Sequence, residues 1–261
     1  MVHAVWNFLV ARSRDPQAAT AIAGVFGALL LLPFALLFGH VGSRALPFAA
    51  GSAALHVGYF ALLALAYTRA DLSVVYPLAR GSAPVLVLVG AVLILGESPS
   101  ALQAVGVVLV ASGVMGVRGF AGDGDRAGEL LGLSVGVTIA AYTVVDKQGV
   151  GHASPLPYLW LLLAPSTAIY CAWLARSRGR AVLMAELRPV TALAGAGMMG
   201  AYALVLGALQ LGPASGVAAT RETSILIATM LGALFLGERV GPLRVLGALA
   251  IVAGVAAVAL G

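Results

Sequence analysis

The sequence is short of charge. Only 10% of its 261 residues are Asp, Glu, Lys or Arg, against about a quarter in a soluble domain. Hydrophobic residues fill 61% of positions, and the mean hydropathy is +1.02. This balance excludes an ordinary soluble domain and indicates an integral membrane protein. The net charge of +5 comes without a run of Lys or Arg, which favours orienting charges in short loops over binding of nucleic acid.

Several motifs that would define an enzyme are also missing. Cys171 is the single cysteine, so no intrachain disulfide can form. No phosphate-binding loop, HExxH pair of histidines or paired-cysteine motif occurs, so neither an ATP-driven machine nor a metal enzyme is supported. We therefore expect no cofactor and no metal site. Strand-type alternation is absent too, which predicts an all-α protein.

Long apolar runs dominate what is present, and each membrane-spanning helix needs about 20 such residues. We predict nine spans of this kind, at residues 17–39, 46–67, 72–95, 100–117, 128–147, 154–175, 190–211, 214–236 and 241–260. Residues 1–11 are apolar but too short to cross alone. We expect them to form the second half of a first helix, with about ten further apolar residues encoded upstream. The prediction is then ten helices.

The pattern of the first half returns in the second half. Leu93-Ile94-Leu95-Gly96-Glu97 recurs 141 positions later as Leu234-Phe235-Leu236-Gly237-Glu238, and the same offset carries Arg80 onto Arg221. The repeats are predicted at residues 1–117 and 128–261, joined by a linker at 118–127. Five helices per repeat is an odd number, so the second copy enters the membrane from the opposite side as an inverted repeat.

Orientation follows from the basic residues of the predicted loops. The loops after the odd-numbered helices hold eleven arginines, and the alternate loops hold only Arg44 and Lys147. The positive-inside rule places the first set in the cytoplasm and both termini outside. We expect a multi-pass protein of the inner or plasma membrane.

The repeated motifs have a recognisable form. Tyr76-Pro77-Leu78-Ala79-Arg80-Gly81 and Arg221-Glu222-Thr223-Ser224 each precede an LGE-type helix end and a last helix punctuated by glycine. The chain thereby resembles the EamA-like transporters of the drug/metabolite transporter superfamily. The resemblance implies ten helices as two inverted five-helix repeats, a central cavity, and export of small metabolites or drugs by secondary transport.

Charged residues within apolar runs are the first candidates for a site. Arg80 lies roughly 12 Å into its predicted helix at about 1.5 Å per residue, and Arg221 and Glu222 lie equally deep from the other face. Such charges are costly in a membrane and should face protein or a wet cavity. We predict substrate-anchoring arginines, with Glu222 as a coupling group. The alternative is a buried Arg–Glu network that only locks helices together.

Aromatic and polar side chains supply further candidates. Tyr142 and Asp146 share one helix face, and Asp146 is a second candidate for coupling, although its position near a helix end also suits an ordinary interfacial charge. Tyr76 accompanies Arg80, and Trp6 and Asn7 lie in the first helix. Amphipathic aromatics in a cavity can stack on or hydrogen-bond a substrate.

These features favour a secondary transporter of small polar or amphipathic molecules. The rival readings are a membrane-embedded enzyme acting on lipid-linked substrates and a non-transporting scaffold subunit. The ten acidic residues and four histidines are scattered, which disfavours the enzyme. We expect a small-molecule substrate and the lipid bilayer as partners, no nucleic acid, and a monomer or homodimer.

Overall fold

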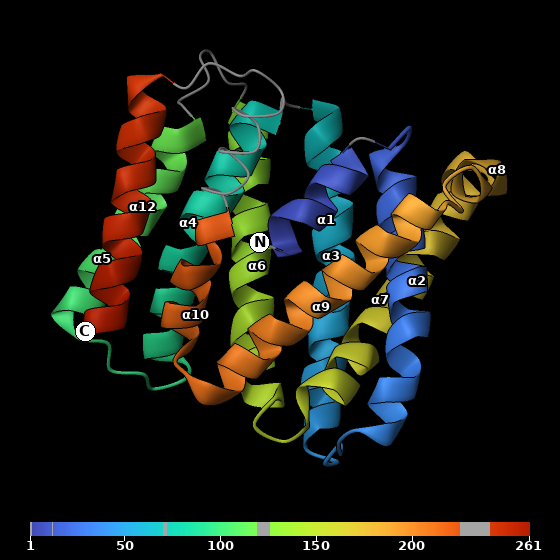
Figure 1. Ribbon diagram of the computed structural model, residues 1–261, viewed down its shortest axis with the longest axis horizontal. Helices are drawn as coiled ribbons and strands as arrows, with labels where there is room; N and C mark the ends of the chain where they lie inside the picture. Colours follow the sequence, from blue (N-terminus) through green and yellow to red (C-terminus); the bar gives the residue numbers. More distant parts are fainter. Residues whose placement is uncertain (1, 12, 70–71, 119–125, 225–240) are drawn as a thin grey trace. The chain divides into compact units, whose positions relative to one another are not determined.

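The computed structural model describes residues 2–11, 13–69, 72–118, 126–224 and 241–261 (Figure 1). These residues fold into helices and contain no strand beyond an isolated bridge between Val41 and Ala153. The all-α prediction is therefore confirmed. The helices are α1 (Val2–Ala11), α2 (Pro16–Leu37), α3 (Ala45–Arg69), α4 (Leu72–Leu93), α5 (Ala101–Arg118), α6 (Arg126–Gly149), α7 (Pro155–Arg178), α8 (Arg180–Met184), α9 (Pro189–Leu211), α10 (Ala214–Arg221) and α12 (Pro242–Leu260).

Five of the described helices are long and apolar enough to cross a membrane. They are Pro16–Leu37, Ala45–Leu63, Arg126–Gly149, Pro155–Arg178 and Pro189–Leu211. Shorter apolar helices cover Ala79–Leu93, Ala101–Gly116 and Val245–Leu260. Large apolar side chains are exposed on the long helices, for example Leu204 and Leu211 of α9. Such exposure is expected where lipid replaces water. The count of ten spans stays a prediction, because much of the run at 214–236 lies outside the described residues.

The chain forms two compact units. The first contains residues 1–60 and 145–211, and the second contains residues 61–144 and 212–261. In the first unit α2 packs on α7 and α9, and α9 also contacts α1. In the second unit α4 packs on α5 and α10, and α5 packs on α12. Each unit therefore takes helices from both sequence repeats.

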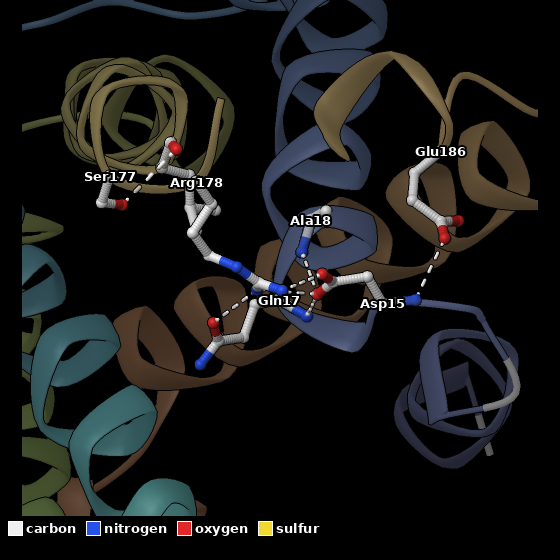
Figure 2. A network of polar contacts seen from close by, with 7 residues as sticks. Asp15, Gln17, Ala18, Ser177, Arg178 and Glu186 are labelled. Carbon is white, nitrogen blue, oxygen red and sulfur yellow. Dashed lines mark hydrogen bonds and ion pairs between the residues drawn. The ribbon is translucent and has the colours of Figure 1, made fainter. Parts of the chain in front are cut away.

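Figure 2 shows how polar contacts tie three helix ends of the first unit together. Asp15 caps α2, because its Oδ1 accepts hydrogen bonds from the backbone N–H groups of Gln17 and Ala18 at 3.1 Å each. Its other oxygen pairs with Arg178 at the end of α7, at 2.6 Å. Its backbone N–H donates to Glu186, in the turn after α8, at 3.1 Å. Asp15 thus caps the N-terminus of α2 and forms an ion pair with an arginine at the C-terminus of α7.

Helices α5 and α12 lie side by side in the second unit (Figure 1), and glycines set their separation. A Cβ atom on Gly106 would lie 2.6 Å from the carbonyl oxygen of Gly254, and one on Gly113 would lie 2.6 Å from that of Gly247. The residue number rises along α5 while it falls along α12, so the two helices are antiparallel. The offset of 141 makes Gly106 equivalent to Gly247 and Gly113 to Gly254. This crosswise pairing of equivalent residues is what an inverted repeat predicts.

We expect Gly113→Ala to destabilise the protein, because the new methyl group meets the backbone of Gly247 and Ile251 as well as the Ile251 side chain. Overpacking of this kind costs about 1–3 kcal/mol. Gly200→Ala in α9 is the matched control, since its methyl group would find no atom within 4 Å. Thermal unfolding in detergent should show a lower midpoint for Gly113→Ala and no loss for Gly200→Ala. Equal midpoints would contradict the close packing of α5 on α12.

Candidate functional site

The clearest polar feature of the second unit is an ion pair between α4 and the end of α10. Nη2 of Arg80 lies 3.1 Å from Oε2 of Glu222, and the two side chains are only 8% and 3% exposed. Arg80 occupies the third turn of α4, and Glu222 directly follows α10. Both were candidates from the sequence alone, and the structure brings them together.

Small residues let neighbouring helices enclose the α4 segment that carries Arg80. A Cβ atom on Gly81 would lie 2.9 Å from the Met115 side chain of α5. A Cβ atom on Gly136 of α6 would lie 3.1 Å from the carbonyl oxygen of Ala79. The guanidinium is therefore surrounded by protein rather than lipid, which is the arrangement that a charge in an apolar helix requires. Removing one partner of such a pair leaves the other charge buried without compensation.

The neighbouring Arg221 is half-buried in the last turn of α10. A cation at this end of a helix interacts favourably with the helix dipole. Arg221 and Glu222 are consecutive, so one helix end presents both a cation and an anion. An ionised substrate group approaching this end would meet charges of both signs.

Glu97 fixes the other end of α10. Its Oε1 accepts a hydrogen bond of 2.7 Å from the backbone N–H of Ala214, and its Oε2 accepts one of 3.1 Å from the hydroxyl of Ser215. Gly96 places it there, with a φ of 68° that an L side chain rarely adopts. In the LGE motif the glycine thus turns the chain after α4, and the glutamate holds the first turn of α10. Its repeat equivalent, Glu238, lies outside the described residues.

We expect Glu97→Ala to lower the free energy of unfolding by about 1.5–3 kcal/mol, the usual contribution of hydrogen bonds to a charged group. Transport should fall as well, because α10 ends at Arg221 and positions Glu222 directly after it. Glu97→Gln keeps an oxygen acceptor and should lose less of both. Thermal unfolding and flux in proteoliposomes measure the two effects.

Gln103 offers a matched control for Glu97. Gln103 and Ser100 exchange hydrogen bonds of 3.0 and 3.1 Å at the start of α5. This is a local cap, so Gln103→Ala should cost about 1 kcal/mol and leave transport near the wild-type level. A loss of transport as large as that of Glu97→Ala would contradict a specific role for the glutamate.

The first unit contains a second buried polar cluster, centred on Asp146 of α6. Asp146 is fully buried. The hydroxyl of Tyr158 in α7 donates to its Oδ1 at 3.0 Å, and the hydroxyl of Tyr202 in α9 donates to its Oδ2. The ring of His56 in α3 meets the ring of Tyr202 edge-on, with centroids 5.7 Å apart. Three helices thus contribute to one hydrogen-bonded group, and α3 packs the ring of His56 against it.

This burial corrects one interpretation of the sequence. An ordinary interfacial charge would be solvated, whereas Asp146 is enclosed and bonded by two tyrosines. The adjacent Lys147 points to a different partner, since its Nζ donates to the carbonyl oxygen of Leu209 at 2.6 Å. Tyr158 and Tyr202 were not predicted from the sequence. The one indication there is that each places a polar hydroxyl within an apolar run.

The remaining predicted site residues are placed as follows. Tyr142 is buried on α6, one turn before Asp146. Trp6 on α1 is partly buried, and its Cβ lies 3.1 Å from the position of a Cβ on Gly197 of α9. Asn7 lies on α1 and Tyr76 on α4, but their side chains fall outside the described part of the structure. Arg80 with Glu222 and Asp146 with its tyrosines are therefore the two groups that the geometry defines.

Comparison with known proteins identifies the class of protein to which this helical fold belongs. The profile of the EamA-like transporter family matches residues 4–119 and again residues 126–260. The chain therefore belongs to the EamA-like transporter family and is a multi-pass membrane protein. A crystal structure described only as "Crystal structure of protein" is similar in fold, with a TM-score of 0.78 and 16% sequence identity. The similarity covers 98% of this chain and 91% of that one. No curated protein matches the chain.

Proposed function

We propose that the protein is a secondary active transporter that exports small polar or amphipathic metabolites or drugs. It does so by alternating access around a central cavity, in the inner or plasma membrane, as a monomer or homodimer. It binds a small molecule and the lipid bilayer, has no nucleic-acid partner and is not an enzyme. The buried Arg80–Glu222 pair is the observation that carries this proposal.

The position of this pair in the repeat supports a transport role. Arg80 and Arg221 are separated by the repeat offset, so each repeat supplies one arginine at an equivalent place. Transporters with inverted repeats bind substrate near the bilayer midplane on helices that are broken there. The described part of α10 stops after eight residues, at Arg221.

Each predicted residue has a role in the proposal. Arg80 and Arg221 anchor an ionised or polar group of the substrate. Glu222 competes with the substrate for Arg80 and couples transport to a gradient, and Asp146 is the second coupling candidate. Side chains of Trp6, Asn7, Tyr76 and Tyr142 contact the remainder of the substrate through stacking and hydrogen bonds.

A ligand screen followed by a flux assay tests this function. The purified protein should be stabilised against thermal unfolding by some members of a panel of amino acids, sugars and cationic drugs, since a ligand that binds only the folded state raises its stability. Each stabilising compound should then enter proteoliposomes saturably. Stabilising compounds that never cross the membrane would contradict transport and favour a binding scaffold. Chemical conversion of a compound would favour an enzyme.

A further inference from the structure

The first unit carries an apolar groove whose lining contains none of the candidate site residues. It has a volume of about 370 Å³ and is open on one side. Helices α2, α7 and α8 and the turn after α8 form its walls. The lining is apolar with one cation, and consists of Ile22, Val25, Cys171, Ala172, Ala175, Arg180, Leu183, Met184 and Leu187.

Small side chains on α7 create the groove. Ala172 and Ala175 leave space beside α2, whose Ile22 is buried in the contact between the two helices. The chain turns at Gly179, with a φ of 87°, and starts the short helix α8. Figure 1 shows α8 end-on beside α2 and α7, so it crosses their ends rather than extending α7. Leu183 of α8 is buried in the same apolar cluster as Ile22.

The residues of this region follow the order found at a membrane surface. Trp173 is half-exposed and stacks on Tyr170 with ring centroids 5.8 Å apart, which suits an aromatic at the headgroup level. Beyond it Arg176, Arg180 and Arg188 are exposed. Within the described residues none of these three arginines forms an ion pair with a carboxylate, whereas Arg178 is held by Asp15 (Figure 2). The groove thus combines an apolar lining with the exposed cation of Arg180, and Arg176 and Arg188 are its near neighbours in the sequence.

We propose that this groove binds an anionic phospholipid. An acyl chain lies along Ala172 and Ala175, and the phosphate is held by Arg180 with support from Arg176 and Arg188. Guanidinium groups bind phosphate with paired, charge-assisted hydrogen bonds, and basic pockets beside membrane helices are suited to anionic headgroups. The sequence predicts this face to be cytoplasmic. The proposed site is separate from transport and does not depend on it.

Native mass spectrometry of the full chain tests the site, with phosphatidylglycerol and phosphatidylcholine of the same acyl chains as probes. Phosphatidylglycerol should bind more tightly. Arg180→Gln should weaken its binding about fivefold, the usual effect of one basic residue near an anionic lipid surface, and leave phosphatidylcholine unchanged. Arg44→Gln removes the same charge from an exposed site directly before α3 and should change the binding of neither lipid. Ala175→Phe fills the groove without altering charge and should displace both lipids.

Four outcomes would overturn the proposal. One is equal affinity for the two lipids, and a second is equal loss in Arg44→Gln, which would indicate only general surface charge. A third is displacement of phosphatidylglycerol by inorganic phosphate, which would indicate a site for small anions. The fourth is a dimer that dissociates in Ala175→Phe, which would make the groove a contact between two copies. Arg180 is exposed, so Arg180→Gln remains informative if Ala175→Phe does not fold.

Discussion

Replacing Arg80 with glutamine is expected to abolish substrate flux and to lower the free energy of unfolding by about 3–5 kcal/mol. Flux is lost because Arg80 is the substrate anchor that we propose. Stability is lost because Glu222 stays buried without its partner at 3.1 Å. Proteoliposome flux and thermal unfolding measure the two losses separately.

A double variant separates binding from packing. Arg80→Met with Glu222→Leu removes both charges and keeps apolar volume, and replacing a buried ion pair in this way is often neutral or stabilising. We expect the double variant to recover most of the lost stability but no flux. Wild-type flux in the double variant would show that the pair only holds helices together.

A more exposed ion pair, between Arg178 and Asp15, is the matched control. Arg178 and Asp15 lie closer, at 2.6 Å, but their side chains are 42% and 19% exposed. Water screens such a pair, so Arg178→Gln should cost about 1 kcal/mol or less and leave flux intact. Equal losses of stability and flux in Arg178→Gln and Arg80→Gln would contradict the claim that burial makes the Arg80–Glu222 pair the more important one.

Glu222→Gln is expected to abolish gradient-driven accumulation while passive exchange of substrate remains measurable. Glutamine keeps the size of the side chain but cannot take up or release a proton, so the coupling step is lost. Arg80 then lacks its buried counter-charge, which lowers stability, but its guanidinium is still present to bind substrate. Accumulation under an imposed pH gradient, compared with exchange in its absence, separates coupling from binding.

Asp146→Asn should reduce transport less than Glu222→Gln. Tyr158 and Tyr202 both donate to Asp146, and an asparagine oxygen can still accept one of those two bonds. Glu222 instead pairs with the cation of Arg80, and an uncharged glutamine is a poor substitute for its carboxylate. If Glu222→Gln accumulates substrate fully under a pH gradient, the coupling role passes to Asp146 or to no carboxylate.

Sequence reasoning reached the features that depend on periodicity and depth. Apolar runs predicted the helices, and the offset of 141 residues predicted the repeat. The packing of Gly106 against Gly254 is consistent with that repeat. The cost of charge in an apolar run required partners for Arg80 and Glu222. Sequence alone left open which partner each would take, because that depends on how each helix rotates against its neighbours.

The contacts of Asp146 and Glu97 could not be predicted for the same reason. Tyr158 lies twelve residues from Asp146, and Tyr202 lies 56 residues away. Glu97 reaches Ala214 across 117 residues. None of these three sequence separations has a signature in the local pattern. The LGE motif marked Glu97 as part of the family resemblance, but the hydrogen bonds to α10 explain what its carboxylate does.

Counterflow in proteoliposomes tests the central claim most directly. Vesicles loaded with an unlabelled compound that stabilises the protein are diluted into a trace of the labelled compound, with no ion gradient imposed. Alternating access predicts a transient accumulation of label above equilibrium, because each outward step with unlabelled substrate returns a site that can carry label inward. The accumulation should be absent in Arg80→Gln. If label only approaches equilibrium, and enters loaded and empty vesicles at equal rates, the result would contradict a transporter that alternates between two faces.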